Sequence, residues 1–275
     1  MHPLRPLRHS TARTAAVATG LAAVTALALA GPAASAGAAT SSSSTTTTTA
    51  AGDPAATALY NAALKSVGSQ GVHFSSVAKQ AGEELDVSGD AGTTSGVQSL
   101  TVKSKKITER MTAKVVGSTG YVQGNEAALE HVIGLTTAES KKYANRWLSF
   151  PTSNQGLGEL VGGLLASQVS KELEIGAPYT YGTDATVAGQ KATAIKGSVA
   201  DQSGANIPVV LYVPKSGTPL PIQEVTNAGK SGNSSAIHGV VTFSHWGENK
   251  TQTAPSGAYS LLKLVPASSS SSTAG

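Results

Sequence analysis

Apolar and polar positions alternate with a period of two along much of the chain between residues 72 and 116. Successive side chains of a β-strand point to opposite faces, so this period predicts strands with one covered and one wet face. The breaks at Gly82, at 91–93 and at 104–105 are short, which predicts antiparallel hairpins between neighbouring strands. The positions expected on the covered face are Leu85, Val87, Gly89, Leu100, Val102, Ile107, Met111, Ala113 and Val115.

Two stretches carry the signals of a helix start. Asp53 followed by Pro54 is an N-cap with proline at the first helical position, and apolar residues recur at helical spacing as far as Val67. Asn125 is a second competent N-cap, and Glu126 follows it in the first turn, where the helix dipole favours an anion. The stretch 120–150 therefore links a short strand to a helix, between two strand-rich halves.

A third helix is predicted over 157–173. Glycines at 156, 158, 162 and 163 weaken its start, since each interior glycine costs about 1 kcal/mol relative to alanine. Two interpretations stay open: a cover that can move, or glycines that let the helix pack closely on the sheet. The apolar stripe of this helix consists of Leu157, Leu160, Val161, Leu164, Leu165, Val169 and Leu173.

Strands resume near Tyr179 and continue over 192–199, 207–213, 222–225 and 237–243. Turns rich in glycine, serine and proline separate them. Seven to nine strands and three helical pieces, with no alternation of strand and helix, predict an α+β fold rather than a doubly wound one.

Both ends of the chain differ in character from the middle. Residues 1–36 combine a basic start, an uncharged apolar run and small residues at 34–36, which predicts a cleaved secretory signal peptide. The alternative is a retained membrane anchor. Residues 37–52 read as a Ser/Thr-rich linker and 267–275 as a similar tail, which leaves one domain over 53–266.

Composition narrows the possible functions. The signal segment holds three of the 20 basic residues and none of the 16 acidic ones, so the mature chain carries a net charge of +1. That balance gives no support to nucleic-acid binding. The sequence has no cysteine, which excludes disulfides, thiolate catalysis, cysteine metal sites and a lipobox cysteine. We therefore expect a secreted protein held together by its own core.

Motifs of known enzymes are weak in this sequence. Ser76-Val-Ala-Lys79 and Ser260-Leu-Leu-Lys263 match the Ser-x-x-Lys of penicillin-recognising enzymes. Lys215-Ser-Gly217 and Lys230-Ser-Gly232 resemble the later Lys-Thr-Gly of the same enzymes. Ser76, however, lies in a strand-like run, and Ser260 follows both Lys-Ser-Gly copies instead of preceding them. Gly-x-Ser-x-Gly, a glycine-rich phosphate loop and His-Glu-x-x-His do not occur. We expect no enzyme activity, no cofactor and no metal.

Four features allow more than one interpretation. Glu109 interrupts the apolar face of its strand, so it lies either at the rim of the sheet or paired inside a cavity. Arg146-Trp147 is either a surface cation–π pair or, the interpretation we favour, a core tryptophan beside a surface arginine. Basic residues on the outer strand face predict a solvated face, with contact to anionic head groups or wall polymers as the alternative. These basic residues are Lys103, Lys105, Lys106, Arg110 and Lys114, and the histidines expected in loops or at edges are His73, His131, His238 and His245.

A set of short motifs resembles a known family. Asp86-Val-Ser-Gly-Asp90, Gly120-Tyr-Val-Gln-Gly-Asn125 and Tyr143-Ala-Asn-Arg-Trp147 resemble the actinobacterial LolA-like proteins of the LppX/LprG type. The late Pro219-Leu-Pro-Ile222 and Val241-Thr-Phe-Ser-His-Trp246 fit the same group, and the resemblance covers nearly all of 53–266. It implies a strongly curved antiparallel sheet, a half-barrel, with helices covering its concave face around an apolar cavity for acyl chains. The missing lipobox cysteine is a departure that puts membrane anchoring in doubt.

From these features we expect a secreted, non-enzymatic, monomeric protein of the cell envelope that binds or carries lipid-like hydrophobic ligands. The pocket is expected where the 157–173 stripe opposes the apolar face of the sheet. The alternative is a structural or interaction module with a dry core. The expected cavity wall consists of Leu160, Val161, Leu164, Leu165, Trp147, Tyr121 and Phe243.

Overall fold

The computed structural model describes residues 52–80, 82–200, 206–228 and 237–264. The predicted signal peptide (1–36), the tail (267–275) and the linker (37–52, apart from Gly52) lie outside the described residues. The limits of the domain, 53–266, stay a prediction.

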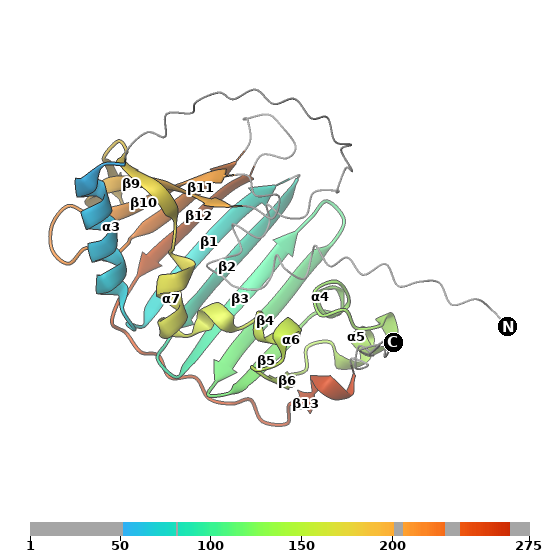
Figure 1. The fold of residues 1–275 in the computed structure, drawn as a ribbon. Helices are drawn as coiled ribbons and strands as arrows, with labels where there is room; N and C mark the ends of the chain where they lie inside the picture. The colour runs from blue at the N-terminus through green and yellow to red at the C-terminus, as the bar shows by residue number, and fades with distance from the viewer. Residues whose placement is uncertain (1–51, 81, 201–205, 229–236, 265–275) are drawn as a thin grey trace, which may run out of the picture.

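One strongly curved, unclosed sheet dominates the described part of the chain, and it contains 13 strands (Figure 1). Their order across the sheet is β13–β6–β5–β4–β3–β2–β1–β12–β11–β10–β9–β7, with β8 paired to β9. Every pair is antiparallel except β13–β6. The strands are β1 (Val72–Gln80), β2 (Glu83–Ala91), β3 (Ser95–Lys103), β4 (Thr108–Val116), β5 (Thr119–Gly124), β6 (Leu148–Pro151), β7 (Gly176–Tyr181), β8 (Ala185–Val187), β9 (Gln190–Ala200), β10 (Asn206–Pro214), β11 (Gln223–Ala228), β12 (Ile237–Ser244) and β13 (Tyr259–Ser260).

The predicted hairpins between β1 and β4 are confirmed. The register pairs Leu85 with Val102 and Val87 with Leu100, so these side chains share one face of the sheet. Ile107 is an exception, since it lies in the turn before β4 and is 40% exposed. The strand count is higher than the predicted seven to nine, in part because β6, β8 and β13 have only four, three and two residues. Such short strands carry no readable period.

Pairing between β1 and β12 joins the two halves of the chain into one sheet. It aligns seven residue pairs, from His73 with Ser244 to Lys79 with His238. The first and the twelfth strand are thus neighbours, although about 170 residues separate them in the sequence.

Both predicted helix starts are confirmed. Helix α3 (Pro54–Val67) is capped by Asp53, whose Oδ1 accepts a 2.8 Å hydrogen bond from the Ala55 backbone N–H. Helix α4 (Glu126–His131) is capped by Asn125, which accepts from the Ala128 N–H at 3.0 Å. A further helix, α5 (Thr137–Tyr143), begins with a capping box.

The prediction of one continuous helix over 157–173 was wrong. The segment 155–173, here called the cover segment, consists of α6 (Gln155–Gly158), the 3₁₀ turn η1 (Gly162–Leu164) and α7 (Ala166–Glu172). Leu165 between them is extended, with φ −103° and ψ 132°. The Gly92 N–H donates to the Leu164 carbonyl at 3.3 Å, and the Ala166 N–H donates to the Gly92 carbonyl at 2.9 Å. These backbone groups bind the sheet instead of continuing the helix.

Helix α3 and the cover segment lie on the same side of the curved sheet, its concave side (Figure 1). The apolar core fills the space between them, and a second 3₁₀ turn, η2 (Leu261–Lys263), contributes Leu261. Among the described helices, none combines the length and the apolar character that a bilayer crossing requires. The largest fully buried side chains include Phe74, Leu85, Leu100, Leu160, Leu164, Leu173, Ile195 and Leu211.

Candidate functional site

The cover segment turns its apolar side chains to the concave face of the sheet. Leu160, Val161 and Leu164 are at most 2% exposed and belong to the same core cluster as Phe243. Leu165 is half-buried and packs against this cluster. The predicted apolar stripe therefore faces the sheet, even though the helix that was to carry it is broken into three.

Few polar contacts hold the cover segment on the sheet. Besides the two hydrogen bonds at Gly92, the side-chain Nε2 of Gln98 donates to the Leu160 carbonyl at 3.1 Å. Gly96 permits the close approach, because a Cβ atom there would lie 2.1 Å from the Leu164 carbonyl oxygen. The Oε1 atom of Gln98 is buried and has no hydrogen-bond partner among the described residues. Most of the remaining contact is apolar.

Phe243 lies on the concave face in the middle of the sheet. The register places it opposite Phe74, which is fully buried. The Phe243 and Trp246 rings lie 5.9 Å apart, and Trp246 Nε1 donates to the Pro221 carbonyl at 2.8 Å. His245 has a φ of 54°, so the chain turns between the two aromatic residues. Strand alternation alone could not have shown that Trp246 returns to the same core.

Tyr121 and Trp147 lie on the opposite, outer face. Tyr121 is half-exposed between the buried Gly120 and Val122, and Trp147 precedes the buried Leu148. The favoured interpretation of Trp147 as a core residue was wrong: its ring stands 5.4 Å from the Lys114 Nζ, a cation–π distance. The structure therefore brings Leu160, Val161, Leu164, Leu165 and Phe243 together, without Tyr121 and Trp147.

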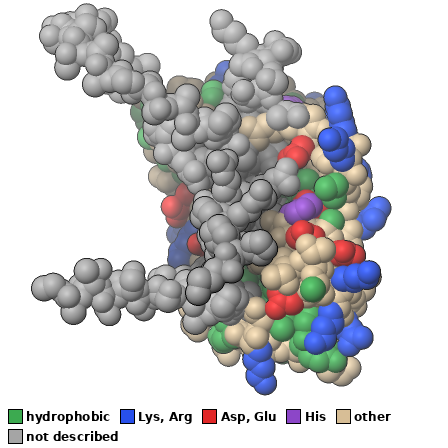
Figure 2. All heavy atoms as spheres, turned by 90° about the vertical axis from the view of Figure 1, so that its right-hand side faces the viewer, with side chains coloured by type: hydrophobic (Ala, Val, Ile, Leu, Met, Phe, Trp, Pro, Cys, Tyr) green, Lys and Arg blue, Asp and Glu red, His purple; other side chains and the backbone are tan. Residues whose placement is uncertain are grey.

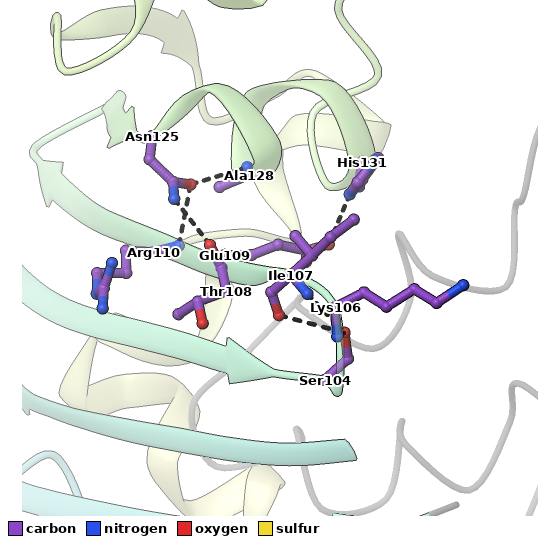
Figure 3. Close-up of polar contacts among 9 residues, drawn as sticks. All are labelled: Ser104, Lys106, Ile107, Thr108, Glu109, Arg110, Asn125, Ala128 and His131. Carbon is purple, nitrogen blue, oxygen red and sulfur yellow. Dashed lines mark hydrogen bonds and ion pairs between the residues drawn. The ribbon is translucent and has the colours of Figure 1, made fainter. Parts of the chain in front are cut away.

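Glu109 is buried and paired, which was one of its two expected situations. Its side chain points from β4 to the end of α4, where its Oε1 lies 2.7 Å from His131 Nδ1 (Figure 3). Glu109 is 7% exposed, whereas the His131 side chain is 29% exposed. At the other end of α4, Asn125 Nδ2 donates to the Thr108 carbonyl at 2.8 Å. Side chains at both ends of α4 thus tie this helix to β4.

The outer face is charged but not uniformly basic. Lys103 Nζ lies 3.0 Å from Glu84 Oε1 and 2.5 Å from Asp86 Oδ2, and Lys79 also contacts Glu84. Hydrogen bonds from Lys103 and Lys79 lower the pKa of Glu84. Figure 2 views the molecule from the side, and many of its Lys and Arg side chains lie along the right-hand side, where the outer face of the sheet is seen edge-on. Acidic neighbours therefore neutralise part of the predicted basic stripe.

Among the described residues, no three His, Asp or Glu side chains are placed to share a metal ion. Of the histidines, His73 Nδ1 lies 2.9 Å from Asp90 Oδ1 and His238 Nδ1 lies 2.6 Å from Asn227 Oδ1. His73 and His238 lie on the outer face of β1 and β12, two interior strands of the sheet, so their expected place in loops or at edges was wrong.

Among known proteins, the matches to this chain are solved structures of low sequence identity. No protein-family model and no curated protein matches the sequence. Among solved structures, LprF from Mycobacterium bovis is 13% identical with a TM-score of 0.48, covering 75% of this chain and 100% of LprF. The lipoprotein LppX from Mycobacterium tuberculosis is 14% identical with a TM-score of 0.43, covering 72% and 98%. MucB is 11% identical with a TM-score of 0.35, covering 79% and 64%.

The class of protein that this architecture defines is an α+β half-barrel with a helical cover on the concave face of its sheet. What the chain does with that architecture has to be argued from its own residues.

Proposed function

We propose that this protein binds or carries lipid-like hydrophobic ligands between the concave face of its sheet and the cover segment. The observation that carries the proposal is the construction of that cover. It consists of helical pieces of four, three and seven residues, with hydrogen bonds to the sheet at Gly92 and Gln98. Short pieces have little helical stability of their own. The cover segment is therefore held mainly by its apolar contacts with the sheet, and these are the contacts that an acyl chain could replace.

Displacement of the cover segment would open a continuous apolar surface. The buried apolar side chains on the covered face of the sheet include Phe74, Leu85 and Leu100, all at most 2% exposed. An acyl chain in place of the cover side chains would gain about 0.8 kcal/mol for each buried methylene. The ligand-contacting residues that we propose are Leu160, Val161, Leu164, Leu165 and Phe243.

The protein would act in the cell envelope, outside the cytoplasm, and without catalysis. The predicted signal segment and the absence of cysteine support this location and a protein that is not lipid-anchored through cysteine. The second candidate is a structural module with a dry core. The full burial of Leu160 and Leu164 favours it, because the core is closed when no ligand is bound.

Binding of diphenylhexatriene, a neutral fluorescent hydrocarbon, to the delipidated protein separates the two candidates. A carrier is expected to bind it with saturable fluorescence, whereas a dry module is expected to give none. The half-buried Leu165 provides the variant, and Tyr121 on the outer face provides the control. Leu165→Ser should weaken binding by about tenfold through lost apolar contact, and Tyr121→Ser should leave it unchanged. Equal effects of both variants would contradict the proposed site.

A further inference from the structure

A carboxyl group stands among apolar side chains on the covered face of the sheet. Glu224 on β11 is 8% exposed, and the register aligns it with Leu211 on β10 and Val241 on β12. Both of these neighbours are at most 1% exposed. Burial is the main cause that raises the pKa of Glu224, and no hydrogen bond from another described residue offsets it. A purely structural core would be more stable with an apolar side chain here, since a buried polar group without a partner costs free energy.

A second polar group without a partner lies in the same transverse row. Ser76 on β1 is aligned with Val241 on one side and with Val87 on the other. Its Oγ atom is buried and has no hydrogen-bond partner among the described residues. Ser76 and Glu224 are two strands apart, a separation of about 10 Å between their backbones. Both side chains lie on the covered face of the sheet, in one row with Val241.

The charge state of Glu224 at neutral pH follows from its surroundings. Burial, and secondarily the charge of Glu172 on α7, raise the pKa of Glu224 to about 8. A neutral carboxyl group has one O–H donor and keeps acceptor capacity. Within the described part of the chain, no Lys or Arg offsets the raised pKa of Glu224, and the charge of Glu172 would repel an anionic ligand group brought to this position.

We propose that Glu224, with Ser76, is the polar recognition point for a ligand bound on this face of the sheet, and that the ligand is a neutral lipid bearing a hydroxyl or ester group. The inference rests on the function proposed above. The apolar row would hold the hydrocarbon chain, and the carboxyl group would exchange hydrogen bonds with the neutral polar group of the lipid. Anionic lipids, such as fatty acids in their carboxylate form, would be disfavoured at the same position.

The test compares two ligands that differ by one polar group, dodecanol and dodecane, by displacement of diphenylhexatriene. Glu224→Met keeps the length of the side chain and removes its hydrogen bonds, so the dodecanol-to-dodecane ratio of dissociation constants should rise by about five- to tenfold. Glu224→Gln keeps a donor and an acceptor and should preserve the wild-type ratio. Thr226→Val, a buried position on the same face of β11, is the matched control and should also leave the ratio unchanged.

The outcomes separate the two proposals. If both ligands bind and the ratio is the same in wild type and Glu224→Met, the role of Glu224 is refuted and the carrier function stands. If neither ligand nor the probe binds wild type, the proposed function fails and the role of Glu224 fails with it. Tighter binding of dodecylamine than of dodecanol would also overturn the inference, because it would mean that an ionised Glu224 selects a cation.

A second measurement needs no variant. Lipids extracted from the purified wild-type protein should be enriched in neutral hydroxyl- or ester-bearing species over anionic phospholipids, relative to the extract of the host cells. An extract with the composition of the host, or one dominated by anionic lipids, would count against the recognition point. This measurement decides the question even if Glu224→Met does not fold.

Discussion

At the scale of single residues, the Glu109–His131 pair links α4 to β4 through one charged contact. Removal of His131 by His131→Ala should lower the free energy of unfolding by about 1–2 kcal/mol, because a hydrogen bond to a largely buried carboxyl group is lost. Urea denaturation measures the change. A double-mutant cycle with Glu109→Ala should give a coupling energy of about 1 kcal/mol. His238→Ala removes an exposed histidine on β12; this control variant should stay within about 0.5 kcal/mol of wild type. If the effects of His131→Ala and Glu109→Ala are strictly additive, the contact between these two side chains is ruled out.

Glu224 predicts a dependence of stability on pH. Its pKa is about 8 in the folded state and 4.5 as the ordinary value, so the folded protein binds more protons than the unfolded chain between these two pH values. The stability that Glu224 contributes is present below pH 4.5 and is lost as the pH rises to 8. Relative to Glu224→Gln, the wild-type free energy of unfolding should fall by up to about 1.4 kcal/mol per pH unit in this window.

Chemical denaturation of both proteins at several pH values measures that difference. Glu84 is the opposite case, because Lys103 and Lys79 lower its pKa. Its contribution is present above pH 4.5 and is lost on acidification, so Glu84→Gln should differ from wild type in the other direction. A constant difference between wild type and Glu224→Gln from pH 4.5 to 8 would show that the carboxyl group is not buried as described.

At the scale of elements, the cover segment depends on a glycine in the neighbouring strand. A Cβ atom at Gly96 would lie 2.1 Å from the Leu164 carbonyl oxygen and 2.9 Å from the Asp90 carbonyl oxygen. Gly96→Ala should therefore push η1 away from the sheet and cost about 2 kcal/mol of stability. Hydrogen exchange followed by mass spectrometry should show faster exchange in 155–173, with β4 unchanged. Ser99→Ala, an exposed position on the same strand, is the control, and unchanged exchange in the Gly96 variant would contradict the close approach.

The same element shows how far a sequence pattern reaches. The stripe of Leu160, Val161 and Leu164 correctly predicted which side chains are buried, because burial follows from apolar periodicity. The continuity of the helix was not predictable from that stripe. The helix is interrupted at Leu165, where backbone hydrogen bonds to Gly92 replace helical ones. Gly92 is more than 70 residues away in the chain, so no local sequence pattern indicates this pairing.

At the scale of the whole molecule, the β1–β12 pairing predicts that both halves unfold together. The chain has two tryptophans, of which Trp147 precedes β6 in the first half and Trp246 follows β12 in the second. Trp147→Phe leaves Trp246 as the reporter, and Trp246→Phe leaves Trp147. Fluorescence of each variant should give the same urea midpoint as its circular dichroism, because one continuous sheet unfolds as one cooperative unit. Two separate midpoints within one variant would mean that the halves are independent.

The sequence by itself determined the covered and wet faces of β2 to β4, the capped starts of α3 and α4, and the α+β class. These features depend on neighbours within a few residues, through side-chain alternation and N-cap hydrogen bonds. Tertiary structure decided the pairing of β1 with β12, the breaks in the cover segment and the choice between Trp147 and Trp246 as the tryptophan of the core. It also brought Glu224 of β11 within electrostatic reach of Glu172 on α7. Each of these depends on contacts between segments far apart in the chain, which local patterns do not encode.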